Sequence, residues 1–442
     1  MAASVRSRPL CRAIAAALLL VLAGCTSASP REPRSPASDS TSESPAASSS
    51  PSASPSETPN EIATSARLRP PDAGSFLVRG TYPRVRSKCL DPQRPSLAAR
   101  YPGTLSVERS EDGTLALTVT LPFETYLEGI AEVPPSWPRA ALEAQAIAAR
   151  SYALATTGWS GAEGETLPTP ICATTSCQVY RGIPVPFEPA VRRWYGAVRR
   201  TSGEVLVYQG RPAETVYFST SNGQTYGNDE VFGSAPLPYL RPVVERDDGA
   251  SPTSHWNVRL PFEDLARFLH EAGEWPRDRA ISSVGLDGTT ITITGSGASR
   301  SMDVSSFRDA VNAWAPCLAP DGYPPGSLPV TIPSRWLTVS SEQDAVVVTG
   351  RGWGHGAGMV QWGAYGKALR GLSASDILAY YYGGLRPESY PEPGLIHVQV
   401  ASGLASVRIV PSGPGARLDG RELGPGSVSI AGGNELTVTT ES

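Results

Sequence analysis

Long apolar runs are scarce in this chain of 442 residues. The longest extends from Ala13 to Leu22, and no later segment approaches the roughly 18 apolar residues that a membrane-spanning helix requires. Arginines precede this run, and Ala23-Gly24-Cys25 follows it. A basic start, a short apolar core and small residues at a cleavage site are typical of a secretory signal. Residues 1–24 are therefore predicted to be a signal peptide rather than part of the fold.

Bulk positive charge is also lacking. Lys88 and Lys367 are the only lysines, the net charge is −4 and the pI is near 5.8. No basic stripe of the kind that follows a phosphate backbone is present, so a nucleic acid is not an expected partner. An acidic polymer would likewise not be held by net charge, because the net charge of the chain is itself negative.

Several catalytic motifs are missing. The glycine-rich segment near residue 355 lacks the Gly-Lys-Ser/Thr of a phosphate loop, and His-Glu-x-x-His is absent. Gly295-Ser296-Gly297 lacks the frame of a serine-hydrolase elbow. The four histidines are scattered. We therefore predict no cofactor and no metal.

Cysteine is infrequent, with six residues in the chain. Removing Cys11 with the signal and assigning Cys25 to a lipid leaves Cys89, Cys172, Cys177 and Cys317. Four cysteines in an exported protein favour two disulfides. Cys172 and Cys177 are close enough to close a small loop, which leaves Cys89 to reach Cys317. Structural zinc at Cys172 and Cys177 is the alternative, although no histidine or third cysteine lies nearby.

The segment after the signal predicts an anchor and a stalk. Leu22-Ala23-Gly24-Cys25 is similar to a bacterial lipobox, in which Cys25 is diacylated; ordinary cleavage beside an incidental cysteine is the alternative. Residues 25–70 are predicted to be a lipid anchor and a disordered linker, because Ser and Pro dominate and little can be buried. This arrangement favours an extracytoplasmic protein on the outer face of the cytoplasmic membrane, acting on the wall.

The remaining chain mixes strand and helix patterns without regular βαβ alternation, which favours the α+β class. Hairpins are expected around Glu111-Asp112-Gly113 and Asp287-Gly288, and a helix is expected from about Pro138 to Thr156. We predict helices and antiparallel hairpins around a substrate cleft in residues 71–390. Residues 391–442 are predicted to form a small all-β C-terminal appendix.

Three regions concentrate glycine, aromatic and polar side chains. They are Leu121–Pro134 with the helix segment Ala144–Leu154, Phe218–Thr225, and Gly350–Gly366. In the third region, the glycines let the backbone approach a ligand, and Trp353 offers an apolar plane for a sugar. A glycine-rich turn around a buried tryptophan is the alternative.

Glu132 lies between Ala131 and Val133 in a largely uncharged stretch. Apolar surroundings raise the pKa of a carboxylic acid, which then donates a proton near neutral pH. Glu124 and Glu128 are rivals, but their spacing of four residues is typical of a solvated helix face. Judged alone, a glutamate before proline is more often structural than catalytic.

Together these motifs resemble the SpoIID/LytB family over roughly Ser106 to Leu385. The resemblance includes Glu132-Val133-Pro134, Cys177-Gln178-Val179-Tyr180, the Ser-Asn-Gly-Gln-Thr turn and Gly-Trp-Gly-His-Gly. It implies lytic transglycosylation of peptidoglycan strands freed of stem peptides, with Glu132 as the acid/base. The family more often has methionine at Val133 and a Gly-Gly pair at Asn222-Gly223.

A single carboxylate suffices for that reaction, whereas a glycoside hydrolase usually needs two. The residues expected to shape the glycan site are Arg150, Tyr152, Gln178, Ser221, Trp353, His355 and Gln361. For Arg150, Tyr152 and Gln178 a structural role is an equal alternative. A non-catalytic, glycan-binding enhancer of another wall hydrolase is the second hypothesis. A hydrolase using Asp229 or Glu230 as a second acid is the third.

Overall fold

The computed structural model describes residues 64–72, 74–82, 98–159, 161, 165–167, 169–183, 189–323 and 331–441. The predicted signal peptide, Cys25, most of the predicted linker and Cys89 lie outside these residues. Within the described ranges, no helix has the length and apolarity needed to cross a membrane.

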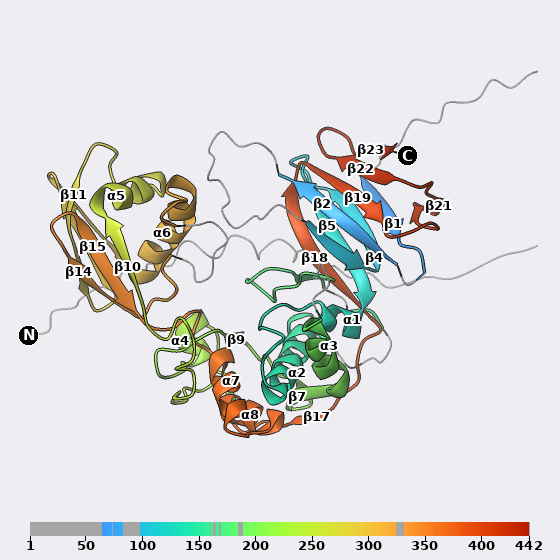
Figure 1. The fold of residues 1–442 in the computed structure, drawn as a ribbon, viewed down its shortest axis with the longest axis horizontal. Helices are drawn as coiled ribbons and strands as arrows, with labels where there is room; N and C mark the ends of the chain where they lie inside the picture. Colours follow the sequence, from blue (N-terminus) through green and yellow to red (C-terminus); the bar gives the residue numbers. More distant parts are fainter. Residues whose placement is uncertain are drawn as a thin grey trace, which may run out of the picture. The chain divides into compact units, whose positions relative to one another are not determined.

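Strands from the two ends of the described chain build two sheets (Figure 1). The seven-stranded sheet runs in the order β21 (Arg421–Glu422), β20 (Arg417–Leu418), β1 (Ser65–Arg69), β4 (Thr104–Arg109), β5 (Leu115–Pro122), β18 (Leu395–Leu404) and β6 (Ile171–Cys172). The five-stranded sheet runs in the order β23 (Thr437–Glu441), β22 (Ser427–Ala431), β19 (Ser406–Pro411), β2 (Ser75–Thr81) and β3 (Ala98–Pro102).

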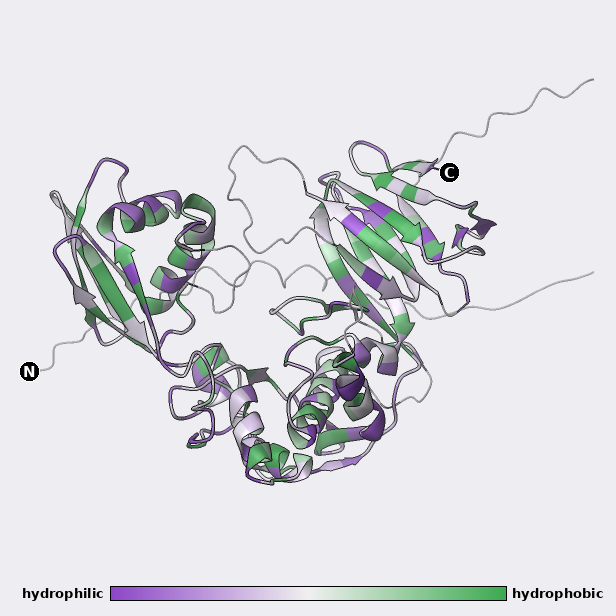
Figure 2. Ribbon diagram, viewed as in Figure 1, coloured by the Kyte–Doolittle hydropathy of each residue, from purple (hydrophilic) through white to green (hydrophobic). Residues whose placement is uncertain are grey.

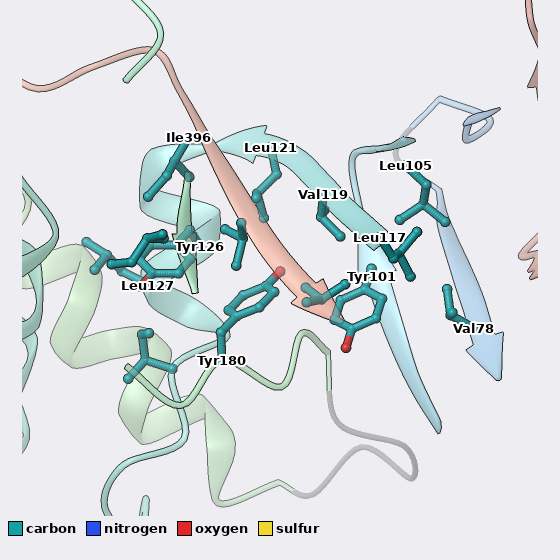
Figure 3. Packing of buried hydrophobic residues seen from close by; sticks show 14 of the residues in the cluster. Val78, Tyr101, Leu105, Leu117, Val119, Leu121, Tyr126, Leu127, Tyr180 and Ile396 are labelled. Carbon is teal, nitrogen blue, oxygen red and sulfur yellow. The ribbon is translucent and has the colours of Figure 1, made fainter. Parts of the chain in front are cut away.

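Apolar residues alternate with polar ones along these strands, and the apolar residues form one core. In β5 every second residue from Leu115 to Leu121 is buried, and the strands of both sheets carry alternating bands of hydropathy (Figure 2). The inward side chains of the two sheets belong to one cluster, in which Tyr101, Tyr126 and Tyr180 lie among the aliphatic residues (Figure 3).

The C-terminal region is all-β, as predicted, and the α+β class is confirmed. Its strands do not form a sheet of their own, however. Strand β18 pairs antiparallel with β5, and β19 pairs antiparallel with β2. Strand β1 pairs with β4 and β20, although its residues fall in the range assigned to the linker. The sequence pattern could not reveal these long-range pairings, because alternation identifies a strand and not its partner.

The helical part surrounds α2 (Arg139–Thr156). Twelve of its residues are buried, because alanines let α3 (Val191–Arg200), α7 (Gln361–Leu369) and α8 (Ala374–Tyr381) approach several faces. Pro138 stands at its N-cap. Further short elements are α1 (Phe123–Glu128), α4 (Asn228–Phe232), β7 (Glu204–Tyr208), β8 (Arg211–Pro212), β9 (Tyr217–Phe218), β16 (Met359–Val360) and β17 (Pro387–Ser389).

A segment with its own core is inserted between the second and third motifs. It contains β10 (Trp256–Pro261), α5 (Phe262–Glu271), β11 (Ile281–Asp287), β12 (Thr290–Gly295), β13 (Ala298–Asp303), α6 (Val304–Leu318), β14 (Leu337–Ser341) and β15 (Ala345–Gly350). Its two ends meet, since Gly352 N donates to Thr253 O at 2.8 Å. The insertion therefore separates the motifs in sequence while leaving them adjacent in space.

Candidate functional site

Glu132 lies just after α1 on a short antiparallel bridge. Ile130 bridges to Tyr180, and Ala131 N donates to Val179 O at 2.9 Å. The amide of Val179 in turn donates to Glu132 Oε1 at 2.7 Å. Gly129 makes this approach possible, because a Cβ there would stand 2.3 Å from the Tyr180 ring. The first motif thus fixes the carboxylate against the backbone of the Cys-Gln-Val-Tyr segment.

A disulfide closes the loop that directly precedes Gln178 and Val179. Cys172 and Cys177 are bonded, with Cα atoms 5.5 Å apart, which confirms the predicted disulfide. Cys317 is also disulfide-bonded, and its predicted partner Cys89 lies outside the described residues. Among the residues that the structure describes, no group of three or more potential metal ligands occurs.

Removing the Cys172–Cys177 bond should destabilise the protein by about 2 kcal/mol, because a five-residue separation closes only a small loop. The double change Cys172→Ser with Cys177→Ser is measured by urea unfolding. We also expect weaker glycan binding, since the loop ends two residues before Val179, whose amide donates to Glu132. Non-reducing peptide maps that recovered both cysteines as free thiols would contradict the assignment.

Uncharged donors surround the Glu132 carboxylate. Burial raises its pKa above the usual 4.5, while the Val179 amide and the Gln361 side chain lower it by a smaller amount. Tyr217 Oη also faces the carboxylate, and within the described chain it makes no hydrogen bond of standard geometry. The charge of Arg181 favours ionisation as well. No carboxylate is among the groups that shift this pKa.

The third motif places Gln361 and Tyr217 beside each other. Strands β16 and β9 pair in parallel, with Met359 opposite Tyr217. Gly358 has φ of 75°, and a Cβ there would stand 1.9 Å from Val216 O, so only glycine fits. Gln361 then begins α7, and its Nε2 donates to Gln145 Oε1 at 3.4 Å.

His355 is engaged through both ring nitrogens. Its Nδ1 accepts from Ala357 N at 3.1 Å, so Nε2 carries the proton and donates to Tyr217 O at 2.9 Å. Burial lowers the pKa of His355 to about 4. A neutral histidine without a free lone pair holds the Tyr217 backbone and does not serve as a base.

Low pH should reduce the stability of the fold, because it protonates the buried His355. Its folded pKa lies below the unfolded value of 6.5, so its contribution is complete above pH 6.5 and is lost as pH falls toward about 4. We expect a loss of about 2–3 kcal/mol from this group over that range. Urea unfolding of the wild type and His355→Gln between pH 7 and pH 4.5 checks this. Equal pH slopes in the two proteins would exclude the assignment.

Ser221 and Trp353 fix the second motif against the third. Trp353 N donates to Thr220 O at 2.8 Å, and Thr220 N donates to Trp353 O at 3.0 Å. The amide and hydroxyl of Ser221 both donate to Asp248 Oδ2 at 2.8 Å. Ser221 is buried, whereas the Trp353 side chain is partly exposed. The geometry therefore favours Trp353 over Ser221 for contact with a ligand.

Arg150 and Gln178 are fully buried. Arg150 binds Glu124 at 2.8 Å and Glu392 at 2.9 Å, and burial raises the pKa of Glu124 to about 7. Gln178 accepts from Tyr126 Oη at 2.8 Å and donates to Ala149 O at 2.9 Å. These contacts favour the structural alternative for both residues.

Tyr152 lies at the Glu132 site. Its ring centroid is 6.5 Å from that of Tyr217. Burial raises the pKa of its hydroxyl, and the charges of Glu214 and Glu132 raise it further. Of the predicted glycan residues, the structure thus brings Tyr152 and Gln361 next to Glu132, with His355 behind Tyr217.

Two residues of this cluster were not predicted. Gln145 is buried in α2, and its Nε2 has no partner among the described residues. Tyr217 directly precedes the second motif. The sequence did carry a signal for Gln145, because it is a polar residue among the alanines of α2. Helical periodicity alone, however, does not show which groups its side chain faces.

Comparison with known proteins agrees with these motifs. The family profile described as Stage II sporulation protein matches residues 111–208. The chain is 31% identical over 278 residues to an uncharacterized protein of Brachyspira hyodysenteriae, covering 62% of this chain and 68% of the relative. It is 28% identical over 275 residues to stage II sporulation protein D of Bacillus subtilis, covering 60% and 74%.

A further relative is the amidase enhancer of Bacillus subtilis. The identity is 28% over 302 residues, which is 59% of this chain and 39% of the enhancer. The profile match contains Glu132 and the disulfide loop, and the geometry above joins them to the later motifs. On this evidence of sequence and arrangement, the chain belongs to the SpoIID/LytB family.

Proposed function

We propose that this protein cleaves the glycan strands of peptidoglycan by lytic transglycosylation, with Glu132 acting first as acid and then as base. The observation that carries the proposal is the position of Glu132, whose carboxylate accepts from the Val179 amide at 2.7 Å and whose pKa is raised by burial. A raised pKa favours the protonated form of the acid, and protonation of a glycosidic oxygen requires that form.

In the first step Glu132 donates its proton to the glycosidic oxygen and the bond from that oxygen to C1 breaks. The Val179 amide and the Gln361 side chain then stabilise the new carboxylate. In the second step Glu132 takes the proton from the C6 hydroxyl of N-acetylmuramic acid while O6 bonds to C1. The product is a 1,6-anhydro ring, Glu132 is again protonated, and no water is consumed.

A second carboxylate is the feature that would point to hydrolysis instead. Asp229 and Glu230 are exposed on α4 and do not contribute to the pKa of Glu132. Glu214 is exposed and influences Tyr152, which makes it the better candidate for a second acid. Under transglycosylation, Glu214→Gln should keep activity within about threefold of wild type. Loss by 100-fold would favour a hydrolase.

Similarity to an amidase enhancer supports a second candidate function. In that case the protein would bind strands and stimulate a separate amidase without cutting glycan. Purified protein incubated alone with strands freed of stem peptides distinguishes the two. New 1,6-anhydro-muramyl ends support cleavage. Their absence, with faster peptide release when an amidase is added, would support the enhancer.

Cleavage should also depend on pH in a defined direction. Because burial raises the pKa of Glu132, its protonated form persists above pH 4.5, and kcat/KM should fall as pH rises through that raised pKa. Gln361→Leu removes a donor to the carboxylate, so the falling limb should move to higher pH. A limb that moved to lower pH would contradict this assignment.

The proposed location is extracytoplasmic, with a lipid on Cys25 holding the chain to the outer face of the cytoplasmic membrane. A signal-like start and a Ser- and Pro-rich segment support it. Metabolic labelling with a fatty acid tests the lipid, and Cys25→Ser should abolish the label.

A further inference from the structure

Gln145 places an amide in an otherwise apolar stretch of α2. This residue is 1% exposed, and its neighbours Ala144 and Ala146 are fully buried. Its Oε1 accepts from Gln361 Nε2 at 3.4 Å, whereas its own Nε2 has no hydrogen-bond partner among the residues that the structure describes. An unpaired buried donor lowers stability, so packing alone does not favour an amide at this position.

The side-chain nitrogen of Gln361 serves two acceptors with its two hydrogens. One hydrogen is donated to Gln145 Oε1, and the other is donated to the Glu132 carboxylate, where it favours the ionised form. The backbone of Gln361 is held in place, because this residue begins α7 directly after β16, which pairs with β9. The remaining freedom of its amide is a half-turn that exchanges nitrogen and oxygen.

The two orientations of the Gln361 amide act on Glu132 in opposite ways. With its nitrogen toward Glu132, the amide donates to the carboxylate. With its oxygen toward Glu132, it accepts, which requires the protonated acid. Without the acceptor of Gln145, the first orientation leaves a buried N–H unpaired, whereas the second leaves only a carbonyl lone pair unpaired. Proteins tolerate the unpaired lone pair more readily, so the oxygen of Gln145 favours the first orientation.

Other groups that face Glu132 do not change their charge while it titrates. Tyr126, Tyr152 and Tyr217 are phenols whose pKa values are raised by burial, and the charge of Glu132 raises them further. Arg181 carries a guanidinium, which stays protonated in proteins. A change in the titration of Glu132 can therefore be assigned to the neighbouring amides.

We propose that Gln145 is a positioning residue, which holds the Gln361 nitrogen toward Glu132 through its side-chain oxygen. In the proposed reaction this arrangement stabilises the carboxylate that forms when Glu132 has given its proton to the glycosidic oxygen. The inference rests on the proposed function only for that step. The orientation of the Gln361 amide does not depend on a bound strand, so it can be tested on the protein alone.

The titration of Glu132 can be followed through stability, without catalysis. The full exported chain and its Glu132→Gln variant are unfolded in urea from about pH 4 to about pH 9, and the difference between their free energies of unfolding is plotted against pH. Because the folded pKa of Glu132 is raised above the ordinary 4.5, its contribution is complete below pH 4.5 and is lost as pH rises through the folded pKa. The pH at which the loss levels off marks that pKa.

The same pair of measurements is then made with Gln145→Met, which keeps the length of the side chain and removes the acceptor. The loss should level off about half a pH unit or more above wild type, as expected for one hydrogen bond to the ionised state. Gln361→Leu should also move this point upward. Adding Gln145→Met to Gln361→Leu should move it no further, because Gln145 acts through Gln361.

Ser151→Ala is the matched control in the same helix. Ser151 is fully buried, and its Oγ accepts from Leu206 N at 2.9 Å and donates to Ile147 O at 2.8 Å. The control should lower stability at every pH and leave the titration of Glu132 in place.

A Glu132 titration that Gln145→Met leaves unchanged would overturn the inference. An additive shift in the double variant would do the same, because it would mean that Gln145 does not act through Gln361. Gln145→Leu is measured alongside as a second variant without the acceptor. If neither variant folds, Gln145 serves the core rather than Glu132, and the inference falls as well.

Strand cleavage separates failure of this inference from failure of the proposed function. If wild type forms 1,6-anhydro ends while the titration of Glu132 is insensitive to Gln145, catalysis stands and the role of Gln145 falls. If no such ends form although Gln145→Met shifts the titration, the positioning role stands and the proposed reaction falls. Where cleavage occurs, the falling limb of kcat/KM should move to higher pH in Gln145→Met, whereas loss of a purely structural residue would lower the rate equally at every pH.

Discussion

Replacing Glu132 by glutamine is expected to lower strand cleavage by about 1,000-fold or more, because the amide neither donates the required proton nor accepts one. The substitution is nearly isosteric, and glutamine still offers an oxygen to the Val179 amide, which lies 2.7 Å from Glu132 Oε1. Binding of the strand should therefore persist. The rate is measured as anhydro ends formed per unit time.

The matched control for this change is Glu128→Gln in α1. Glu128 lies four residues before Glu132 and pairs at 2.9 Å with Arg199, whose side chain is 71% exposed. An exposed ion pair contributes little, so this variant should cleave at about the wild-type rate. Retention of a tenth or more of the activity by Glu132→Gln, with an unchanged melting temperature, would remove Glu132 from the chemistry.

Replacing Lys367 is expected to cause a large loss of stability. This lysine is buried, and its Nζ donates to Glu245 Oε1 and to Asp247 Oδ2, each at 3.0 Å. The Glu245 side chain is completely enclosed and also accepts from Tyr381 Oη. Changing Lys367 to methionine would leave this carboxylate buried with no cation. Breaking one side of a buried pair costs about 3–5 kcal/mol, and urea unfolding measures it.

Arg370 provides the control for Lys367. It pairs with the same Asp247 at 2.7 Å, but its side chain is 65% exposed, so Arg370→Met should cost less than about 1 kcal/mol. An equal loss in the free energy of unfolding for the two variants would contradict the claim that burial makes the Lys367 pair more important.

The Lys367 pair also explains how the site is held together. Residues 245–248 link α7, which starts at Gln361, to the Ser221 turn through Asp248. We therefore expect Lys367→Met to reduce cleavage even at temperatures where the protein remains folded.

Local elements of the fold could be predicted from the sequence where periodicity and turn residues agree. The helix over Arg139–Thr156 and the hairpin of Ile281–Asp287 with Thr290–Gly295 are examples. Long-range pairing could not be predicted, as β18 with β5 illustrates, because a strand pattern does not encode the identity of its neighbour. The separate core of the inserted segment was missed for the same reason.

The candidate site could be predicted only because several motifs of one family occur together in the chain. The groups that face the Glu132 carboxylate are not local to it, since Val179, Tyr217 and Gln361 lie far along the chain. The buried roles of Arg150 and Gln178 were equally invisible, because a polar residue in a motif gives no sign of whether it faces ligand or core.

The most direct test of the central claim is digestion of strands without stem peptides in water enriched in oxygen-18, followed by mass spectrometry of the new ends. If Glu132 serves as a single acid and base for ring closure, the ends are 1,6-anhydro-muramyl residues that carry no heavy oxygen. Reducing ends that contain one oxygen-18 at C1 would show that water is the nucleophile and would contradict the account.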